Sequence, residues 1–260
     1  METPFKPGRL GANIFDLFDS VEPGRLLDLP AGAGDESIRL TAMGHRVVSL
    51  DLFTPGRIAE RRLLWVRADC NYPLPIRDAS FDYVLSREGI EHFENQFGFI
   101  RECARVLRPG GRIVITTPNV MHIAARLSHF LTGQRTMRSG LANEVQTLRG
   151  AGAGRYYHGH IFLVDYFRMR YMMRLAGLGR IEVMSDRASP SSLAMAWVAP
   201  LMYLASRRTA NSFARRAIKR KRAVPSSELT REIQRHVFSP AMLFGKRMIV
   251  TALREGSRAE

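Results

Sequence analysis

The chain has 260 residues, of which 45% are hydrophobic and 24% charged, so it is long enough for one large α/β domain and wholesale disorder is excluded. Its formal net charge of +15 favours an anionic partner: a nucleic acid, an acidic glycan or an anionic membrane surface. The two cysteines, Cys70 and Cys103, form no CxxC pattern, so neither a disulfide scaffold nor a structural zinc site is indicated, and a reducing compartment is expected.

Short apolar runs alternate with helical patterns in the first half of the chain, which is typical of βαβ units and a parallel sheet. Helices are expected at 35–43, ended by Gly44, and at 95–107, ended by the RPGG run at 108–111. The expected strands are 25–29, 46–50, 64–68, 81–86 and 112–117.

The regularity weakens after Pro118. A helix is possible over 119–134, and the segment 135–160, which contains GAGAG, is predicted to be a mobile loop near the acceptor site. Asp165 is a suitable N-cap for a helix that ends before Gly177. Two further strands, 180–184 and 246–253, bring the expected total to seven. Between them, 187–227 contains nine Arg or Lys and no Asp or Glu, and is interpreted as a basic and apolar insertion.

The stretch LLDLPAGAGDES, residues 26–37, has the strand, glycine turn and helix start of a nucleotide-binding unit. Dinucleotide sites have the pattern GxGxxG and place a pyrophosphate at the helix N-terminus. Here Ser37 replaces the third glycine, and Asp35 and Glu36 occupy the helix start. Two carboxylates repel a pyrophosphate, so the ligand is expected to be uncharged or cationic at this point.

S-adenosylmethionine meets that requirement because it carries an ammonium and a sulfonium but no phosphate. Asp28, at the end of the first strand, can accept hydrogen bonds from the ammonium, and Gly32 and Gly34 allow close approach of the backbone. Asp51 follows the second strand, where it can accept both ribose hydroxyls, and Asp69 follows the third, near the adenine. A single acid at a strand end is often a helix cap, but three in register are a stronger signal. The predicted cofactor-binding residues are Asp28, Ala31, Gly32, Gly34, Asp51, Leu52, Asp69, Cys70 and Arg87.

On these motifs residues 26–133 resemble the class I S-adenosylmethionine-dependent methyltransferases. The stretches RADCNYPLPIRDASFDYVLSREGIEHFEN, FIRECARVLRPGGRIVITTPN and ARLSHFLTG are similar to a bacterial subgroup associated with surface-polysaccharide or lipid-linked sugar methylation. The resemblance implies a single domain over 1–260 with a Rossmann-like, mostly parallel seven-stranded sheet, its last strand antiparallel and helices on both faces, plus a basic helical insertion before that strand. Pro30 and Ala31 before Gly32 depart from the commoner glycine-rich turn.

The SREGIEHFEN stretch follows the strand expected to end beside the sulfonium. Methyl transfer needs a positioned nucleophile and an acceptor for its proton, and His92 is the candidate general base because histidine titrates near neutrality. Glu88 and Glu91 are expected to orient that imidazole or to line the cofactor or acceptor, and Arg87 to meet the cofactor's carboxylate. The alternative is an ordinary helix start with acids at its N-terminus and a packed His92.

Acceptor contacts are predicted for Asn119, just after the fifth strand, and for His158 and His160. The TTPN sequence around Asn119 is equally consistent with a turn. A metal site at the histidine pair is disfavoured because no third ligand has suitable spacing.

Three functions compete at this point. The first is an S-adenosylmethionine-dependent methyltransferase, EC 2.1.1.-, acting on an oxygen of a glycan, lipid-linked or small-molecule acceptor. The second is an RNA-binding or RNA-modifying methyltransferase, favoured by the sequence pI of about 10.9 but not by SREG, which replaces the D/N/S-P-P-aromatic pattern of nucleobase-methylating enzymes. The third is a non-catalytic binding protein, which the intact set of cofactor residues disfavours.

The N-terminal sequence lacks the basic and apolar pattern of a signal peptide, so a cytoplasmic location is expected. The apolar run 193–205 is too short to span a bilayer, and eight Arg or Lys follow it by residue 222. This combination predicts peripheral attachment to an anionic membrane through 193–222. The alternatives are RNA binding or a buried helix with a solvated basic end, and Pro200 argues against one continuous helix.

Overall fold

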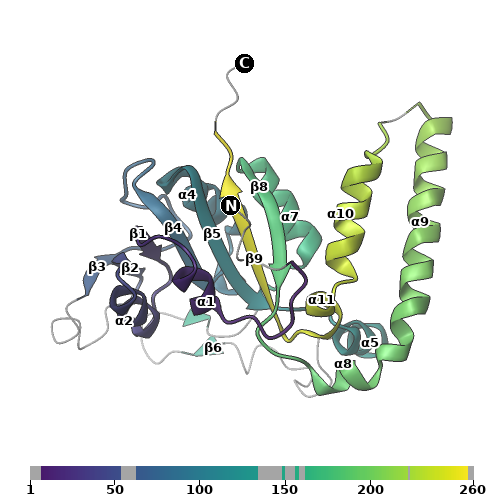
Figure 1. Cartoon of the computed structure of the whole chain (residues 1–260), viewed down its shortest axis with the longest axis horizontal. Coiled ribbons are helices and arrows are strands. Elements are labelled where there is room, and N and C mark those ends of the chain that lie inside the picture. Colours follow the sequence, from purple (N-terminus) through teal and green to yellow (C-terminus); the bar gives the residue numbers. More distant parts are fainter. Residues whose placement is uncertain are drawn as a thin grey trace.

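The computed structural model describes residues 7–53, 63–133, 148–149, 156–157, 162–221 and 223–256. Its centre is a seven-stranded sheet of order β3-β2-β1-β4-β5-β9-β8 (Figure 1). β9 runs antiparallel to both neighbours, whereas β1 to β5 pair in parallel. The strands are β1 Arg25–Asp28, β2 Arg46–Asp51, β3 Leu64–Arg67, β4 Phe81–Arg87, β5 Leu107–Pro118, β8 Leu178–Met184 and β9 Arg247–Arg254.

Two apolar cores lie on opposite faces of this sheet because successive side chains of a strand point to opposite faces. Leu26 packs in one core with α1 and α2, and Leu27 packs in the other with α4 and α7. Val114 of β5 likewise lies in the first core, and its neighbours Ile113 and Ile115 lie in the second. Both faces of the strands are thus buried, as in doubly covered parallel sheets.

The helices are held at their ends by the residue types that favour caps. Asp165 accepts hydrogen bonds from the backbone N–H groups of Phe167 and Arg168, and Asn95 accepts one from Gly98. The helices are α1 Ile14–Asp19, α2 Asp35–Ala42, α4 Gln96–Val106, α5 Ile123–Thr132, α7 Tyr166–Leu175, α8 Pro190–Ala194, α9 Ala199–Lys219, α10 Ser227–Val237 and α11 Pro240–Phe244, with 3-10 turns η1 Ile90–His92 and η2 Ala196–Val198.

The seven strands, the antiparallel last strand and the helix after Asp165 confirm the sequence prediction. The helix expected from 119 begins only at Ile123, because Asn119 is used in a tertiary contact and His122 is the N-cap. The fifth strand starts earlier than expected, at Leu107, which already pairs with Phe81 before the register shifts. Of the expected loop, the structure describes only β6 Leu148–Arg149 and β7 Tyr156–Tyr157, which pair with each other.

The basic insertion is helical but interrupted. α8 ends at Ala194, η2 follows, and α9 starts at Ala199 with Pro200 in its first turn, where the missing N–H costs nothing. In Figure 1, α9 stands at the far right, with α10 between it and the sheet. Among the described helices, none is both long and apolar enough to cross a bilayer.

Candidate functional site

Three carboxylates meet at one edge of the sheet. Asp28 and Asp51 are the last residues of β1 and β2, and Asp69 comes two residues after the end of β3. The three strands are parallel neighbours, so their carboxyl ends lie at the same edge. In open α/β sheets this edge is where ligands bind.

Asp28 is buried, with 1% of its surface exposed. Its Oδ2 accepts a hydrogen bond of 2.6 Å from the Ser37 hydroxyl, which in turn accepts one of 2.7 Å from the Ser49 hydroxyl. Burial raises the pKa of Asp28 to about 7; the Ser37 hydrogen bond opposes this shift, and the nearby Asp51 adds to it. This contact explains why a serine replaces the third glycine of the motif.

The glycine turn after β1 is tied to β2 and open on its outer side. Gly32 donates to Asp51 Oδ2 at 2.8 Å, and Ala31 donates to the Leu50 carbonyl at 2.9 Å. Gly32 and Gly34 have φ of +55° and +82°, which side chains rarely adopt. A Cβ added at Gly32 would meet nothing within 4 Å, so a ligand can approach this backbone.

Asp51 and Asp69 accept hydrogen bonds from the chain that follows β2 and β3. Asp51 uses its other oxygen to accept from the Phe53 N–H at 2.9 Å, and a carboxylate with two such bonds retains acceptor capacity. Asp69 accepts from the Asn71 backbone and side chain at 2.9 and 3.0 Å. The Cys70 side chain packs in the core, where burial raises the pKa of its thiol. Leu52 is half-buried beside Asp51.

Arg87, the last residue of β4, forms an ion pair with Glu36 in the first turn of α2. The ion pair uses one nitrogen of the guanidinium, whose other N–H donors are left for the predicted contact with a ligand carboxylate. Gly89 follows closely, and a Cβ there would lie 2.3 Å from Cδ of Pro30. The turn after β4 and the glycine turn after β1 are thus in direct contact.

The short η1 turn that carries His92 is anchored by buried polar groups. Glu91 is fully buried and accepts from the Thr117 hydroxyl at 3.0 Å, while its carbonyl accepts from the Phe162 N–H at 3.1 Å. Gln96 donates to the Ile90 carbonyl at 2.9 Å. These bonds fix the turn, and His92 is half-buried on it, beyond the end of β4.

Glu88 belongs to a different cluster from the one expected. It accepts from the Thr116 hydroxyl at 3.3 Å, and its Oε2 lies 3.5 Å from Nε of Arg247, which also donates to Asp186 at 2.8 Å. The expectation that Glu88 orients the His92 imidazole is therefore corrected, because its side chain is held by Arg247 and Thr116. Burial raises the pKa of Glu88, and its φ of +50° marks local backbone strain.

Asn119 also needs correction. Its side-chain nitrogen donates to the carbonyls of Met242 and Gly245 at 3.0 and 2.8 Å, and its oxygen accepts from the Met121 N–H at 2.8 Å. Both polar atoms of the side chain are used in these bonds, so Asn119 ties the end of β5 to α11, and the predicted acceptor contact gives way to this structural role. His158 and His160 lie outside the described residues.

Sequence reasoning missed Ser49 and the Arg247–Asp186 pair. The sequence shows Ser37 as a departure from the glycine pattern, but its hydrogen bond to Asp28 is a finding of the structure. Arg247 and Asp186 lie beside Glu88 because β9 is placed between β5 and β8 in the sheet. No local sequence pattern predicts that contact.

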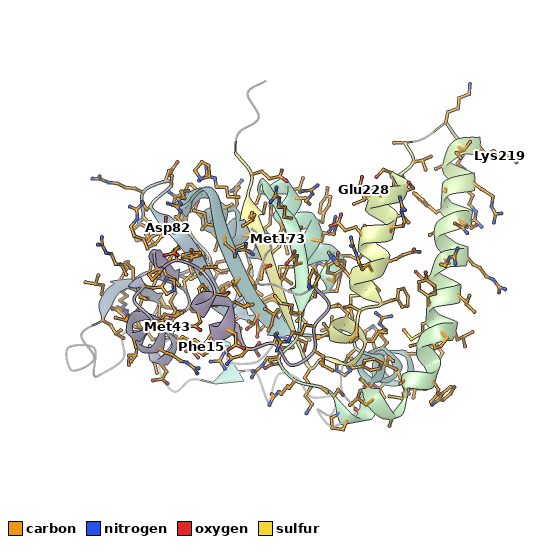
Figure 2. The ribbon with its side chains drawn as sticks, in the orientation of Figure 1. Phe15, Met43, Asp82, Met173, Lys219 and Glu228 are labelled. Carbon is orange, nitrogen blue, oxygen red and sulfur yellow. The ribbon has the colours of Figure 1, made fainter. Side chains whose placement is uncertain are left out.

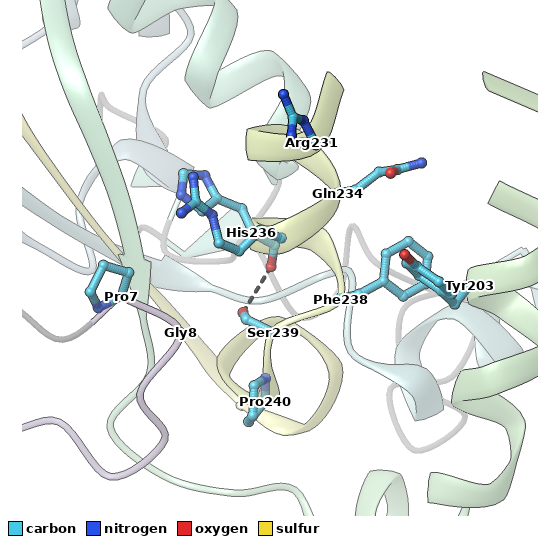
Figure 3. Close-up of a pocket in the computed structure, with 10 residues that line it drawn as sticks. Pro7, Gly8, Tyr203, Arg231, Gln234, His236, Phe238, Ser239 and Pro240 are labelled. Atoms are coloured by element: carbon cyan, nitrogen blue, oxygen red, sulfur yellow. Dashed lines mark hydrogen bonds between the residues drawn. The ribbon is translucent and has the colours of Figure 1, made fainter. Parts of the chain in front are cut away.

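A pocket of about 450 Å³ lies apart from this edge, next to α10 (Figure 3). Tyr203 of α9 faces it from one side and Gly8, which is bonded to β8, from the other. Its wall includes His236, whose backbone oxygen accepts from the Ser239 hydroxyl, the dashed line in Figure 3. Because β8 is the far edge strand of the sheet, this pocket is separate from the three strand-end acids.

Comparisons with known proteins match the part of the chain that carries the strand-end acids. Residues 27–115 match the family model described as a methyltransferase domain. These residues are a class I methyltransferase domain. A probable S-adenosylmethionine-dependent methyltransferase of Mycolicibacterium smegmatis is 36% identical over 98 residues, 36% of this chain and 38% of that protein. The 27-O-demethylrifamycin SV methyltransferase of Amycolatopsis mediterranei is 35% identical over 103 residues, 35% of this chain and 37% of that protein.

The methyltransferase fold extends beyond the matched residues. The crystal structure of a SAM dependent methyltransferase from Archaeoglobus fulgidus aligns with a TM-score of 0.53 at 14% identity, covering 92% of this chain and 89% of that chain, which shows the fold alone. This chain spans less than two fifths of the length of these two curated relatives. The methyltransferase match ends within β5, so β8, β9 and the helices α8 to α11 lie outside it.

The cofactor of this family is S-adenosylmethionine, and the residues of the strand-end site fit it. The fit rests on the open backbone at Gly32, the remaining acceptor capacity of Asp51 and the buried carboxyl of Asp28. At this edge, Asp35 and Glu36 occupy the first turn of α2, where a dinucleotide site would place its pyrophosphate.

Proposed function

We propose that the protein transfers a methyl group from S-adenosylmethionine to an oxygen of a glycan, a lipid-linked sugar or another small-molecule acceptor. The observation that carries the proposal is the set of three strand-end carboxylates, Asp28, Asp51 and Asp69, around a glycine turn whose outer side is open. The relative whose name specifies an O-demethylated substrate supports oxygen as the acceptor atom.

Each residue of the edge has a defined task in this proposal. Asp28 accepts from the ammonium of the cofactor, and Asp51 accepts from the ribose hydroxyls. Asp69 with the Cys70 main chain borders the adenine. Arg87, which Glu36 holds through one guanidinium nitrogen, binds the cofactor's carboxylate through its other N–H groups. Bound there, the cofactor supplies an electrophilic methyl group.

The acceptor approaches from the side of η1 and β9. His92 takes the proton of the attacking hydroxyl, and the anchored η1 turn holds the His92 backbone in place. The Glu88–Arg247–Asp186 cluster lies at the ends of β4, β8 and β9 and offers both donors and acceptors, which suits an acceptor rich in hydroxyls.

Two measurements test the proposal. Calorimetry should show binding of S-adenosylmethionine and S-adenosylhomocysteine but not of NAD, and saturable NAD binding would overturn the cofactor assignment. Mass spectrometry of surface glycans and lipid-linked intermediates, from cells with and without the protein, should show a difference of one methyl group. A methyl difference confined to RNA would refute the glycan acceptor and favour the nucleic-acid alternative.

A further inference from the structure

Helix α9 has little contact with the rest of the molecule. Of its residues only Ala217 is buried, although the helix runs from Ala199 to Lys219. Its main aromatic contact with the body is the edge-on packing of Tyr203 against Phe238, with ring centres 5.2 Å apart. The opposite, outer face of α9 is therefore presented to the surroundings, and in Figure 2 the side chains there, including Lys219, project away from the molecule.

Large apolar side chains lie on the first half of that outer face. Trp197 of η2 is 77% exposed, and Leu201 and Leu204 of α9 are 67% and 54% exposed. The spacing of four and three residues places them on one side of the chain. Apolar groups of this size are rarely left exposed together on a soluble surface without a partner.

A second set of exposed apolar side chains comes from α5. Leu127, Phe130 and Leu131 follow helical spacing, and Phe130 is 84% exposed. α5 is joined to α8 by Ser192, whose hydroxyl contacts His122 Nδ1 at 2.8 Å and accepts from the Ala124 N–H at 3.1 Å. In Figure 1, α5, α8 and the start of α9 meet at the lower right of the molecule. We call Leu127, Phe130, Leu131, Trp197, Leu201 and Leu204 the α5–α9 apolar patch.

Positive charge continues the outer face beyond this patch. Arg208, Arg215 and Lys219 follow Leu201 and Leu204 at helical spacing, and all are exposed. No Asp or Glu occurs from 187 to 227, so no acid of this segment neutralises them. An apolar patch next to a cationic face without acids is complementary to an anionic lipid surface. The apolar side chains enter the headgroup region, and the cations lie close to the negative charges of the lipids.

We propose that the α5–α9 apolar patch and the basic face of α9 dock the protein on an anionic lipid membrane. A second copy of the chain is a poorer occupant, because pairing of identical α9 faces would bring like charges together. The docking is independent of which acceptor the site methylates, since none of its residues belongs to the strand-end site.

The test is flotation of the whole chain with vesicles of phosphatidylglycerol or of phosphatidylcholine. The protein should float with the anionic vesicles, remain with the soluble fraction in neutral vesicles, and detach as salt is raised. Leu201→Ser with Leu204→Ser should lower the partition coefficient at least about tenfold through lost apolar burial. Arg208→Gln with Arg215→Gln should lower it about 25-fold, since each cation contributes about fivefold.

The controls are Tyr171→Ser and Arg168→Gln on α7, which alter equally exposed apolar and basic groups away from the patch and should leave flotation unchanged. Circular dichroism and cofactor binding verify that each variant is folded. Equal flotation of the wild type and the α9 variants, or equal flotation with both lipids, would overturn the proposal. A dimer in light scattering that the leucine variant dissociates, without vesicle binding, would assign the patch to a second copy, and RNA retention without vesicle binding would assign the basic face to RNA.

Discussion

The buried Asp28 predicts that cofactor binding releases a proton near neutral pH. The pKa of this carboxyl is raised from 3.8 to about 7, first by burial, so the free protein holds it largely protonated at pH 6. Accepting hydrogen bonds from an ammonium requires the carboxylate, because a protonated carboxyl loses the charge that makes the contact strong. The proton must therefore leave when the cofactor arrives.

The size of the effect follows from the pKa of about 7. At pH 6 roughly 0.9 proton should be released for each cofactor bound and at pH 8 roughly 0.1, and the affinity should fall about tenfold between pH 8 and pH 6. Folding shows the same linkage. The unfolded chain ionises Asp28 near 3.8 and the folded chain near 7, so this group lowers the stability as pH rises between those values, by about 4 kcal/mol in total.

The assay is calorimetry of S-adenosylhomocysteine binding at pH 6 and pH 8 in buffers of different ionisation enthalpy. Two variants serve as comparisons, Asp28→Asn and Ser37→Ala. The asparagine cannot ionise, so Asp28→Asn should show no proton release from this position. Because the Ser37 hydrogen bond lowers the pKa of Asp28, removing it should move the midpoint of the release to higher pH. Proton release that is the same in the wild type and in Asp28→Asn would refute the reasoning.

Three further outcomes are expected. Asp51→Ala should weaken cofactor binding by about 1–3 kcal/mol in calorimetry, because the ribose hydroxyls lose their acceptor, and an undiminished affinity would place the ribose elsewhere. His92→Ala should reduce turnover of the true acceptor by about 10²–10⁴-fold while cofactor affinity stays near that of the wild type, whereas full turnover would return His92 to a structural role. Asn119→Ala should lower the free energy of unfolding in urea by about 1–3 kcal/mol, because the buried carbonyls of Met242 and Gly245 lose their donor; a change in acceptor affinity with unchanged stability would contradict the structural role.

The parts of the fold that the sequence predicted well are those set by local patterns. Successive side chains of each strand point to opposite faces, which places Leu26 and Leu27 in different cores. Because both faces are buried, these strands are visible in the sequence as short apolar runs between helical patterns. Acids at successive strand ends, such as Asp28 and Asp51, could be aligned because parallel strands end at one edge. Ser37 stands out in the sequence because it replaces the third glycine of a known motif.

The remaining features depend on contacts between distant segments. Glu88 meets Arg247 across 159 positions of chain because β9 inserts beside β5, and Asn119 reaches α11 across more than 120. Such pairs leave no periodic signal in the sequence. The roles expected for Glu88 and Asn119 therefore rest only on their positions after a strand. The exposure of α9 also depends on tertiary structure. The sequence pattern of this segment predicts a helix, but it does not predict whether that helix packs on the sheet or stands away from it.

The contact between Gly89 and Pro30 constrains how this site can change. A side chain at residue 89 would have its Cβ only 2.3 Å from Cδ of the Pro30 ring, so it would displace the glycine turn that follows β1. Pro30 and Gly89 are 59 positions apart in the chain, but this contact couples the two turns, so one cannot move without the other. An engineer who wishes to alter acceptor choice by replacing the η1 turn must keep a glycine at 89, or replace the turn at Pro30 together with it.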